Sequence, residues 1–310
     1  EITALYNSGI PLAASSNSGN YTSSTNLKGY WRHNENSGSI SHDLSGNGNH
    51  GTISGATSVT PGASNTPVLS VTSSSNNATY KIGDVIPVNV TFGAAVTVSG
   101  TPQLTLETGS TDAVVNYSSG SGGATLTFNY TVASGHVSSD LDYTSTSALA
   151  LNGGTINDAN GNAATLTLAA LGQANSLGGN KALVIDGVLP TVASVTSTTS
   201  NGTLKVGDVA AITVTFSEAV TVSGTPQLTL ETGSSDAVVD YTSGSGGTTL
   251  TFNYTVASGH VSSDLDYAST SALALNGGTI NDANGNAATL TLAAVGQANS
   301  LGANKALVID

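Results

Sequence analysis

The sequence contains no cysteine and no methionine among its 310 residues. Disulfide frameworks, thiolate metal sites and cysteine nucleophiles are therefore excluded. Charged residues are also scarce, at 8%, and only 6 Lys or Arg stand against 19 Asp or Glu. The net charge of −13 gives phosphates no basic surface to bind, so nucleic acid is not an expected partner.

Long hydrophobic runs are missing as well. No apolar run approaches the roughly 20 residues that a membrane helix needs, so we expect no membrane span. No initiator Met, signal peptide or anchor is visible, and we expect a mature or excised piece of a longer protein. The chain does have 38% hydrophobic residues, 37 glycines and abundant Ser and Thr. High apolar content with low charge favours a folded, strand-rich chain over a disordered one.

A tandem repeat organises most of the chain. Residues 97–107 recur as residues 221–231, and the offset stays constant along the whole repeat without insertion or deletion. Roughly four-fifths of the aligned positions are identical. The linker between the copies is short and contains one proline, so we expect it to be semi-rigid. The resulting division is an N-terminal segment (1–66), repeat 1 (67–186), the linker (187–190) and repeat 2 (191–310).

Inside each repeat the hydrophobic period is two. In residues 125–132 and again in residues 165–168, apolar side chains alternate with Thr or Asn. Such alternation predicts strands with one buried and one solvated face, and clusters of Gly, Ser and Asn separate them. Residues 181–186 are predicted as the last strand of repeat 1. The predicted fold class is all-β: two tandem antiparallel sandwiches of about seven strands each, after a short strand-rich N-terminal segment.

Two stretches of repeat 2 carry a family resemblance. Residues 211–220 (AITVTFSEAV) and 282–286 (DANGN) resemble bacterial Ig-like and cadherin-like repeats of large secreted surface proteins and adhesins. The resemblance extends over both repeats and implies Ig-like sandwiches and an extracellular or cell-surface, secreted location. Repeat 1 departs from the pattern, because it has Gly-Ala-Ala at 93–95 where repeat 2 has Ser-Glu-Ala at 217–219. Any role of Glu218 is therefore absent from repeat 1.

The N-terminal segment has a different resemblance. Residues 29–35 (GYWRHNE) and 43–51 (DLSGNGNHG) are similar to the opening end of a laminin-G-like, concanavalin-type lectin domain, and residues 1–9 (EITALYNSG) to its closing end. The middle of that jelly roll is absent. We therefore hypothesise that these strands complete a sheet in a neighbouring subunit, because open strand edges favour strand addition. Tyr30 and Trp31 are the candidate sugar-contacting residues, and a core position is the alternative for both.

Carboxylates are the plentiful reactive groups. Two carboxylates placed two residues apart on a strand point to the same side, and they repel unless a cation or hydrogen bonds offset them. Calcium takes about six to eight oxygen ligands, which Asn/Gly-rich turns could complete, and the cadherin-like resemblance implies calcium between domains. In the alternative interpretation, the Asp side chains accept hydrogen bonds from nearby backbone N–H groups. The candidate calcium ligands are Asp140, Asp142, Asp158, Asp186 (expected near Asp84 or Asp208), Asp208, Asp264, Asp266 and Asp282.

Catalysis is not expected. A glycosidase needs two carboxylates across a cleft, and a duplicated carboxylate pair fits architecture better. The adjacent residues Ser41-His42-Asp43 have the residue types of a serine triad, but such triads are assembled in space rather than from neighbours in sequence. His136 and His260 each follow Ser-Gly, so a loop surface is expected and metal ligation is the alternative.

These observations favour a non-enzymatic extracellular structural or adhesive protein, a stalk or fibre segment of tandem sandwiches. Its expected partners are neighbouring copies of itself or further repeats of a longer chain. One alternative is a self-assembling filament subunit joined by strand exchange through residues 1–66. The other is a carbohydrate-binding adhesin that uses the lectin-like segment to bind surface glycans.

Overall fold

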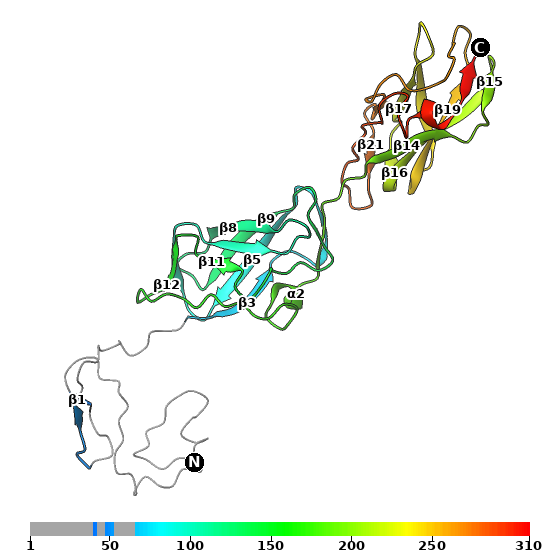
Figure 1. The fold of residues 1–310 in the computed structure, drawn as a ribbon. Helices are drawn as coiled ribbons and strands as arrows, with labels where there is room; N and C mark the ends of the chain where they lie inside the picture. The colour runs from blue at the N-terminus through cyan, green and yellow to red at the C-terminus, as the bar shows by residue number, and fades with distance from the viewer. Residues whose placement is uncertain (1–39, 42–46, 53–65) are drawn as a thin grey trace. The chain divides into compact units, whose positions relative to one another are not determined.

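The computed structural model describes residues 40–41, 47–52 and 66–310 (Figure 1). In the N-terminal segment, β1 (Ile40–Ser41) and β2 (Gly51–Thr52) pair antiparallel, with Ile40 opposite Thr52. Tyr30 and Trp31 lie outside the described residues, so the lectin-like and sugar-contact hypotheses stay predictions.

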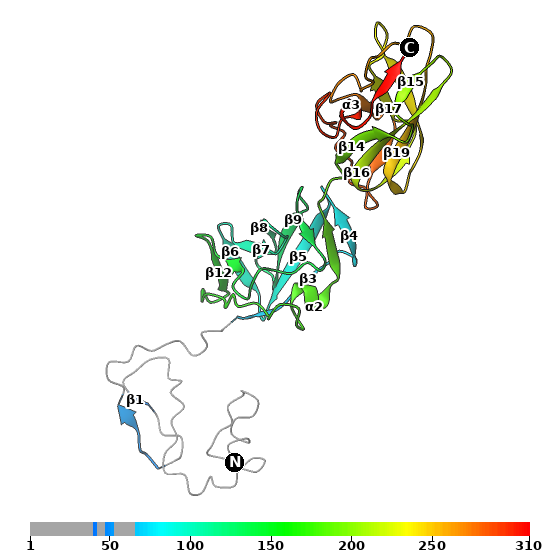
Figure 2. The ribbon, with the colours of Figure 1, turned by 45° about the vertical axis from the view of Figure 1, so that its right-hand side comes forward.

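The regular elements of repeat 1 are strands, apart from the short helix α2 (Figure 2). The largest sheet has the order β11-β7-β8-β9-β5-β3, and smaller sheets have the orders β10-β13-β4 and β12-β6. The elements are β3 (Val68–Ser73), β4 (Ala78–Lys81), β5 (Val85–Phe92), β6 (Val96–Ser99), β7 (Gln103–Leu106), β8 (Ala113–Ser119), β9 (Thr125–Thr131), β10 (Val137–Ser138), β11 (Leu149–Ala150), β12 (Thr155–Asp158), α2 (Leu177–Asn180) and β13 (Leu183–Asp186).

Repeat 2 follows the same plan. Its main sheet has the order β14-β16-β19-β18-β17-β20, with β21 also paired to β16, and β15 pairs with β22. The elements are β14 (Val192–Ser197), β15 (Gly202–Leu204), β16 (Val209–Ser223), β17 (Gln227–Leu230), β18 (Ala237–Ser243), β19 (Gly247–Thr255), β20 (Leu273–Ala274), β21 (Thr279–Asn281), α3 (Leu301–Asn304) and β22 (Leu307–Ile309).

The period-two pattern places the apolar side chains in the interior. Along β9, Leu126, Phe128 and Tyr130 are buried while the Thr and Asn side chains between them are not. Burying a side chain of this kind stabilises the fold by about 1.5–3 kcal/mol. Buried residues between 71 and 185 form a hydrophobic cluster, and those between 195 and 309 form a separate one. The predicted all-β Ig-like sandwich class is confirmed.

The two repeats differ in the segment that follows Phe92 in repeat 1 and Phe216 in repeat 2. Repeat 2 has the continuous β16, whereas repeat 1 has β5 and β6 with Gly93 between them. In repeat 2 the Ser217 hydroxyl accepts a hydrogen bond from Thr191 N at 3.0 Å, and Ser217 N donates to Thr191 O at 2.8 Å. In repeat 1 Gly93 N donates to Pro67 O at 2.9 Å, but Pro67 has no N–H to donate in return. A hydroxyl acceptor would therefore have no donor here, and a glycine weakens the strand.

Three details of the structure differ from the sequence expectations. Each repeat contains a parallel ladder, β13 with β4 and β22 with β15, where antiparallel pairing was predicted. Hydrophobic alternation specifies which face is buried but not the direction of the neighbouring strand. Residues 181–182 precede the last strand, because Lys181 is the C-cap of α2. Residues 165–168 form no strand; Thr165 makes an isolated bridge to Pro67 and Leu168 is buried.

No helix in the described part of the chain is long and apolar enough to cross a membrane.

Candidate functional site

The first candidate group consists of the carboxylates that follow β10. Asp140 and Asp142 lie in an irregular segment rather than on the extended strand that was expected. Leu141 between them is fully buried. Both carboxylates still face the same neighbour, because a Cβ added to Gly178 would lie 3.1 Å from Asp142 Oδ2 and 3.5 Å from Asp140 Oδ2. Together with Glu107 they line a hollow of about 390 Å³.

Backbone N–H groups occupy the Asp142 carboxylate. Its Oδ1 accepts from Tyr143 N at 2.9 Å and its Oδ2 accepts from Gly172 N at 3.0 Å. This local bonding explains the irregular segment, because an Asp side chain that bonds nearby backbone competes with the strand ladder. Asp266 of repeat 2 is only 6% exposed and accepts the two equivalent bonds. The backbone N–H groups thus offset the negative charge of Asp142 and Asp266, which a cation would otherwise offset. The carboxylates of Asp140 and Asp264 are exposed to solvent.

The second candidate group lies in the turn 282–286, which has the same sequence as the turn 158–162 of repeat 1. The Asp282 Oδ1 atom accepts from the backbone N of Asn284 and of Asn286, both at 2.8 Å, and Oδ2 accepts from Asn286 Nδ2 at 2.8 Å. Asp282 is 4% exposed, and Asp158 at the start of the other turn is also buried. An oxygen surrounded by N–H donors is a poor calcium ligand, because the metal needs the same lone pairs.

The turn 282–286 also contacts the end of repeat 1. Asn286 Nδ2 donates to Asp186 O at 3.0 Å, and Asn286 Oδ1 accepts from Ile82 N at 3.0 Å. Asn284 Nδ2 donates to Asp186 Oδ2 at 2.6 Å. We call these five residues, Ile82, Asp186, Asp282, Asn284 and Asn286, the joint. The Asn side chains were expected to offer oxygens to a metal, but here they act largely as donors.

Two further carboxylates were expected beside Asp186. Asp84 Oδ2 accepts from Lys81 N at 3.0 Å, and Asp208 Oδ2 accepts from Lys205 N at 2.8 Å, so each bonds within its own turn. Glu218 is the carboxylate beside the joint that the calcium prediction did not include. Burial raises the pKa of Glu218, and the negative charges of Asp282 and Asp186 raise it further. The Ser-Glu-Ala sequence of repeat 2 was the signal that could have found it.

Within the described residues, no group of three or more His, Asp or Glu side chains has an arrangement that could hold a metal ion. The hydrogen bonds of Asp142, Asp266 and Asp282 favour the alternative interpretation, in which carboxylates accept hydrogen bonds from backbone N–H groups. Calcium at these carboxylates stays a prediction.

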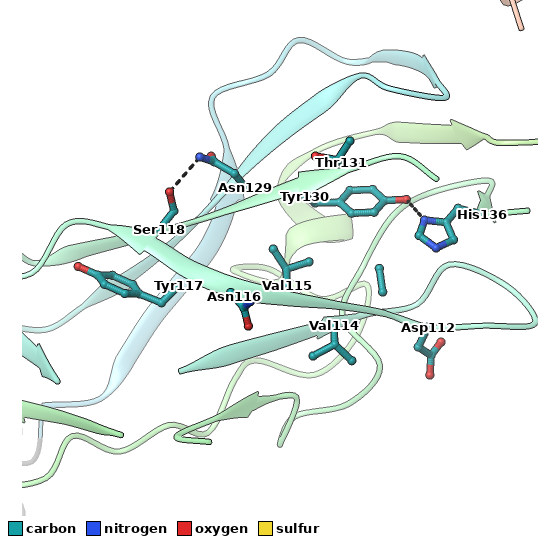
Figure 3. A pocket seen from close by; sticks show the side chains of 11 residues that line it. Asp112, Val114, Val115, Asn116, Tyr117, Ser118, Asn129, Tyr130, Thr131 and His136 are labelled. Carbon is teal, nitrogen blue, oxygen red and sulfur yellow. Dashed lines mark hydrogen bonds between the residues drawn. The ribbon is translucent and has the colours of Figure 1, made fainter. Parts of the chain in front are cut away.

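A polar groove is the third candidate, and each repeat has one. In repeat 1 it has a volume of about 580 Å³ and lies between β8 and β9 (Figure 3). β8 pairs with β9 only at Tyr117 and Ser119, with an irregular register between them, whereas residues 113–116 of β8 pair only with β7. Asp112, Asn116 and His136 are among the polar residues that line it.

A tyrosine and a histidine form one wall of this groove. The Tyr130 hydroxyl lies 3.0 Å from His136 Nδ1, and the two rings stack with centroids 5.7 Å apart (Figure 3). Ala133 N also donates to Nδ1, at 3.2 Å, so this nitrogen is the acceptor and the ring proton of the neutral imidazole sits on Nε2. Burial raises the pKa of Tyr130, which keeps its hydroxyl protonated as a donor.

Repeat 2 has the same pair, with Tyr254 and His260 2.9 Å apart. The sequence analysis placed both histidines on loop surfaces and missed their tyrosine partners. The signal was the identical stretch NYTVASGH in both copies, in which Tyr and His are separated by a constant spacing. The hydrogen bonds of each histidine to the tyrosine hydroxyl and to the backbone of the loop hold the loop after the strand in place.

Comparison with known proteins finds one family model that matches a segment of the chain. Residues 186–294 match the family model of a bacterial Ig-like domain. The match covers most of repeat 2, agrees with its sandwich fold, and supports a surface or structural protein in general. No curated protein shows a significant match to the chain.

Proposed function

We propose that this chain is a non-enzymatic segment of an extracellular stalk or fibre, in which complete sandwiches follow one another. The observation that carries the proposal is the duplicated core. Equivalent residues such as Phe128 and Phe252 are fully buried in two separate hydrophobic clusters, so each repeat buries its own apolar surface. A stalk gains length by adding repeats that each bury their own hydrophobic core, and it needs no reactive site.

The linker supports this proposal because both of its ends are bonded. Gly187 N donates to His136 O at 2.7 Å, and Gly187 O accepts from Gly135 N at 2.7 Å. At the other end, Pro190 O accepts from Thr289 N at 2.8 Å. A Cβ on Gly187 would lie 2.3 Å from Ala133 O, so only glycine fits against this backbone. Two residues remain between the bonded ends, which favours a stiff connection.

Single-molecule force spectroscopy on the full chain tests the proposal. We expect two unfolding events, each releasing a contour length of about 40 nm, since each repeat has about 120 residues. Phe128→Ala should weaken only one of the two events, and Phe252→Ala is its matched control. A single event that releases both lengths together would contradict the proposal.

Two further proposals depend on residues 1–66. Strand exchange through this segment would make the chain a filament subunit, and sugar contact through Tyr30 and Trp31 would make it a carbohydrate-binding adhesin. Deleting the segment should abolish polymers seen by electron microscopy in the first case and glycan-array binding in the second. If neither polymers nor glycan binding exist before the deletion, both ideas are wrong.

Calcium is a separate proposal for the carboxylates described above. If Asp142, Asp186 or Asp282 holds calcium, chelation should lower the melting temperature of the full chain, and added calcium should restore it. An unchanged melting temperature would leave these carboxylates as acceptors for N–H groups alone.

A further inference from the structure

Within the described residues, each repeat leaves part of one strand edge without a ladder partner, and the polar groove lies along that edge. In repeat 2, residues 237–240 of β18 pair with β17, but only residues beyond them pair with β19. Val238 lies opposite Thr229 of β17, and Thr229 N donates to Ala272 O at 3.0 Å, on the side away from β18. In an antiparallel pair of this kind, the backbone groups of both residues point away from each other. The N–H and C=O groups of Val238 therefore point into the groove.

The strand on the other side of the groove has an open edge as well. Thr255 of β19 lies opposite Val209 of β16, and Val256 N donates to Asp208 O at 2.9 Å. Because ladder bonds alternate along an antiparallel strand, Thr255 directs its backbone groups away from β16 and toward the groove. Thr255 is exposed and Val238 is 58% exposed, so an incoming strand can reach both edges.

The exposed side chains beside the open edge of β18 have a regular pattern. Asp236, Val238 and Asp240 are exposed and alternate with buried neighbours, so this face presents an acidic, an apolar and an acidic side chain in turn. Gln227 Nε2 donates to Asp240 Oδ1 at 2.8 Å, which holds that carboxylate in place. Among the described residues that line the groove, none is lysine or arginine. A cation on a ligand would therefore meet two carboxylates and no competing positive charge.

Repeat 1 has the same open edge with one carboxylate fewer. Val114 points its backbone groups into the groove, because the N–H of Thr105 opposite it again donates away from β8. Figure 3 shows the side chains of Asp112, Val114 and Asn116 on one side of β8. Asn116 stands where repeat 2 has Asp240. The groove of repeat 1 is therefore a matched control for the groove of repeat 2.

We infer that the groove between β18 and β19 binds an extended peptide that has two basic side chains four residues apart. The peptide adds as a strand to the open edge of β18, where backbone hydrogen bonds supply affinity and side chains supply specificity. Asp236 and Asp240 are four residues apart, about 13 Å along a strand, so basic side chains at that spacing lie opposite both. An apolar residue midway between them lies opposite Val238. The groove volume of about 520 Å³ is ordinary for a ligand site.

The inference goes beyond the proposed function, because a stalk segment needs no ligand. Its failure would leave the two separate unfolding events of the stalk proposal untouched. Failure of the stalk proposal would likewise leave the open edge and its carboxylates in place, because both belong to repeat 2 alone.

The probe is the capped, fluorescein-labelled peptide TKTVTKT, added to the full chain. Its two lysines and central valine share one face of an extended strand. Because a short added strand makes few hydrogen bonds, we expect a Kd of about 10 μM to 1 mM by fluorescence polarisation. The peptide TETVTET should bind at least about tenfold more weakly, since it sets like charges against each other.

Two altered peptides separate strand addition from simple attraction between opposite charges. TKTVKTT has the same composition, but one lysine lies on the other face of the strand, and it should bind at least about threefold more weakly. N-methylation of the valine in TKTVTKT removes the N–H that would donate to Val238 O, and it should weaken binding at least about fivefold. Hydrogen exchange followed by NMR should show that TKTVTKT protects the Val238 amide.

Protein variants test the difference between the two repeats. Asp240→Asn, which copies Asn116, should weaken binding to repeat 2 about threefold, and Asn116→Asp should strengthen binding to repeat 1 by the same factor. Both residues are exposed, so the fold should survive, which an unchanged melting temperature would verify. Asp264→Asn removes the same charge from an exposed residue outside the groove lining and should leave the affinity unchanged.

Three results would overturn the inference. One is equal binding of TKTVTKT and TKTVKTT, and another is binding of TKTVTKT that leaves exchange of the Val238 amide unchanged. The third is no binding at millimolar peptide. Protection of the Val238 amide by a neutral oligosaccharide, maltohexaose, in place of the peptide would assign the groove to sugars instead. Protection that grows with the concentration of the chain alone would assign it to a second copy.

Discussion

The two repeats have equivalent but separate hydrophobic cores, and they differ in the segment that follows Phe92 and Phe216. Repeat 2 has the unbroken β16, the hydroxyl of Ser217 and the carboxylate of Glu218, whereas repeat 1 has Gly93 and Ala94 at these places. The change from Pro67 to Thr191 accompanies the change from Gly93 to Ser217, because the new N–H can bond the new hydroxyl. The alternation of buried and solvated side chains, which both repeats keep, determines the fold. The substitutions in this segment change the hydrogen bonds and charges near the start of each repeat.

Loss of a core aromatic residue should have the largest effect. Phe128→Ala leaves a cavity in repeat 1 and should lower its free energy of unfolding by about 3–5 kcal/mol. In calorimetry of the full chain, the overlapping transitions of the two repeats should then separate, with repeat 2 unchanged. Phe252→Ala should produce the mirror result. If both transitions shifted together, the two repeats would fold as one unit.

Loss of the buried asparagine at the joint comes next. Asn286→Ala removes bonds to Asp186, Ile82 and Asp282 and should destabilise repeat 2 by about 1–3 kcal/mol. Asn284→Ala is the control, because Asn284 is exposed and its variant should lose less. Urea titration measures both. Equal effects would show that burial of Asn286 adds nothing.

The tyrosine after the carboxylate pair should matter equally in both repeats. The Tyr143 hydroxyl donates to Ala169 O at 2.5 Å, and Tyr267 makes the same bond, so each Tyr→Phe change should cost about 1 kcal/mol. Burial, and then the charge of Asp142, raise the pKa of Tyr143 to about 12. The unfolded chain ionises first, so stability should fall as the pH rises from 10 through 12.

The Phe variants report this loss of stability directly. Tyr143→Phe should remove the part of the alkaline loss that comes from this tyrosine in repeat 1, and Tyr267→Phe the equivalent part in repeat 2. The parts that come from Tyr130 and Tyr254, whose pKa burial also raises, should stay. Urea titrations at several pH values measure it. Persistence of the whole loss in the double variant would contradict the assignment.

Removal of Glu218 should have the smallest effect and the opposite sign. Its pKa is raised in the folded protein above the ordinary 4.5, so folded repeat 2 binds the proton more tightly than the unfolded chain. Stability should therefore rise as the pH falls through the folded pKa toward 4.5. Glu218→Ala, which copies Ala94, should stabilise repeat 2 at neutral pH by about a few tenths of a kcal/mol, because solvent screens the charges. The melting temperature of Glu218→Ala is measured at neutral and at acid pH, with Ala94→Glu as the control. A lower melting temperature of Glu218→Ala at neutral pH would contradict the predicted sign.

Much of the fold followed from the sequence because side-chain alternation reports burial directly. Residues 125–132 show this, since every apolar position among them is buried. The same rule failed at residues 165–168, where only the second leucine is buried and the backbone forms no ladder. A short alternating run gives too little information about partners, and strand direction is not encoded in it at all.

The candidate site was less predictable, because the role of each carboxylate depends on which donor atoms the fold brings within hydrogen-bond distance of it. Asp282 was identified correctly as a residue of an Asn/Gly-rich turn, but the turn supplies N–H donors where oxygens were expected. The partners of Asp186 lie across the linker, in the turn 282–286, and no spacing rule connects them to it. The partner of His136 lies six residues away, but the residue types alone do not show that the two side chains bond. Residue type alone cannot separate a metal ligand from an acceptor of backbone hydrogen bonds.

The parallel ladder between β4 and β13 has a mechanical consequence. β4 lies near the start of repeat 1 and β13 at its end, and they run in the same direction. Tension applied to the start of one strand and the end of the other slides the strands past each other. All of the rungs are then loaded at once, instead of opening one by one as in an unzipped hairpin. A tether under sustained pulling gains resistance from that geometry without any covalent staple.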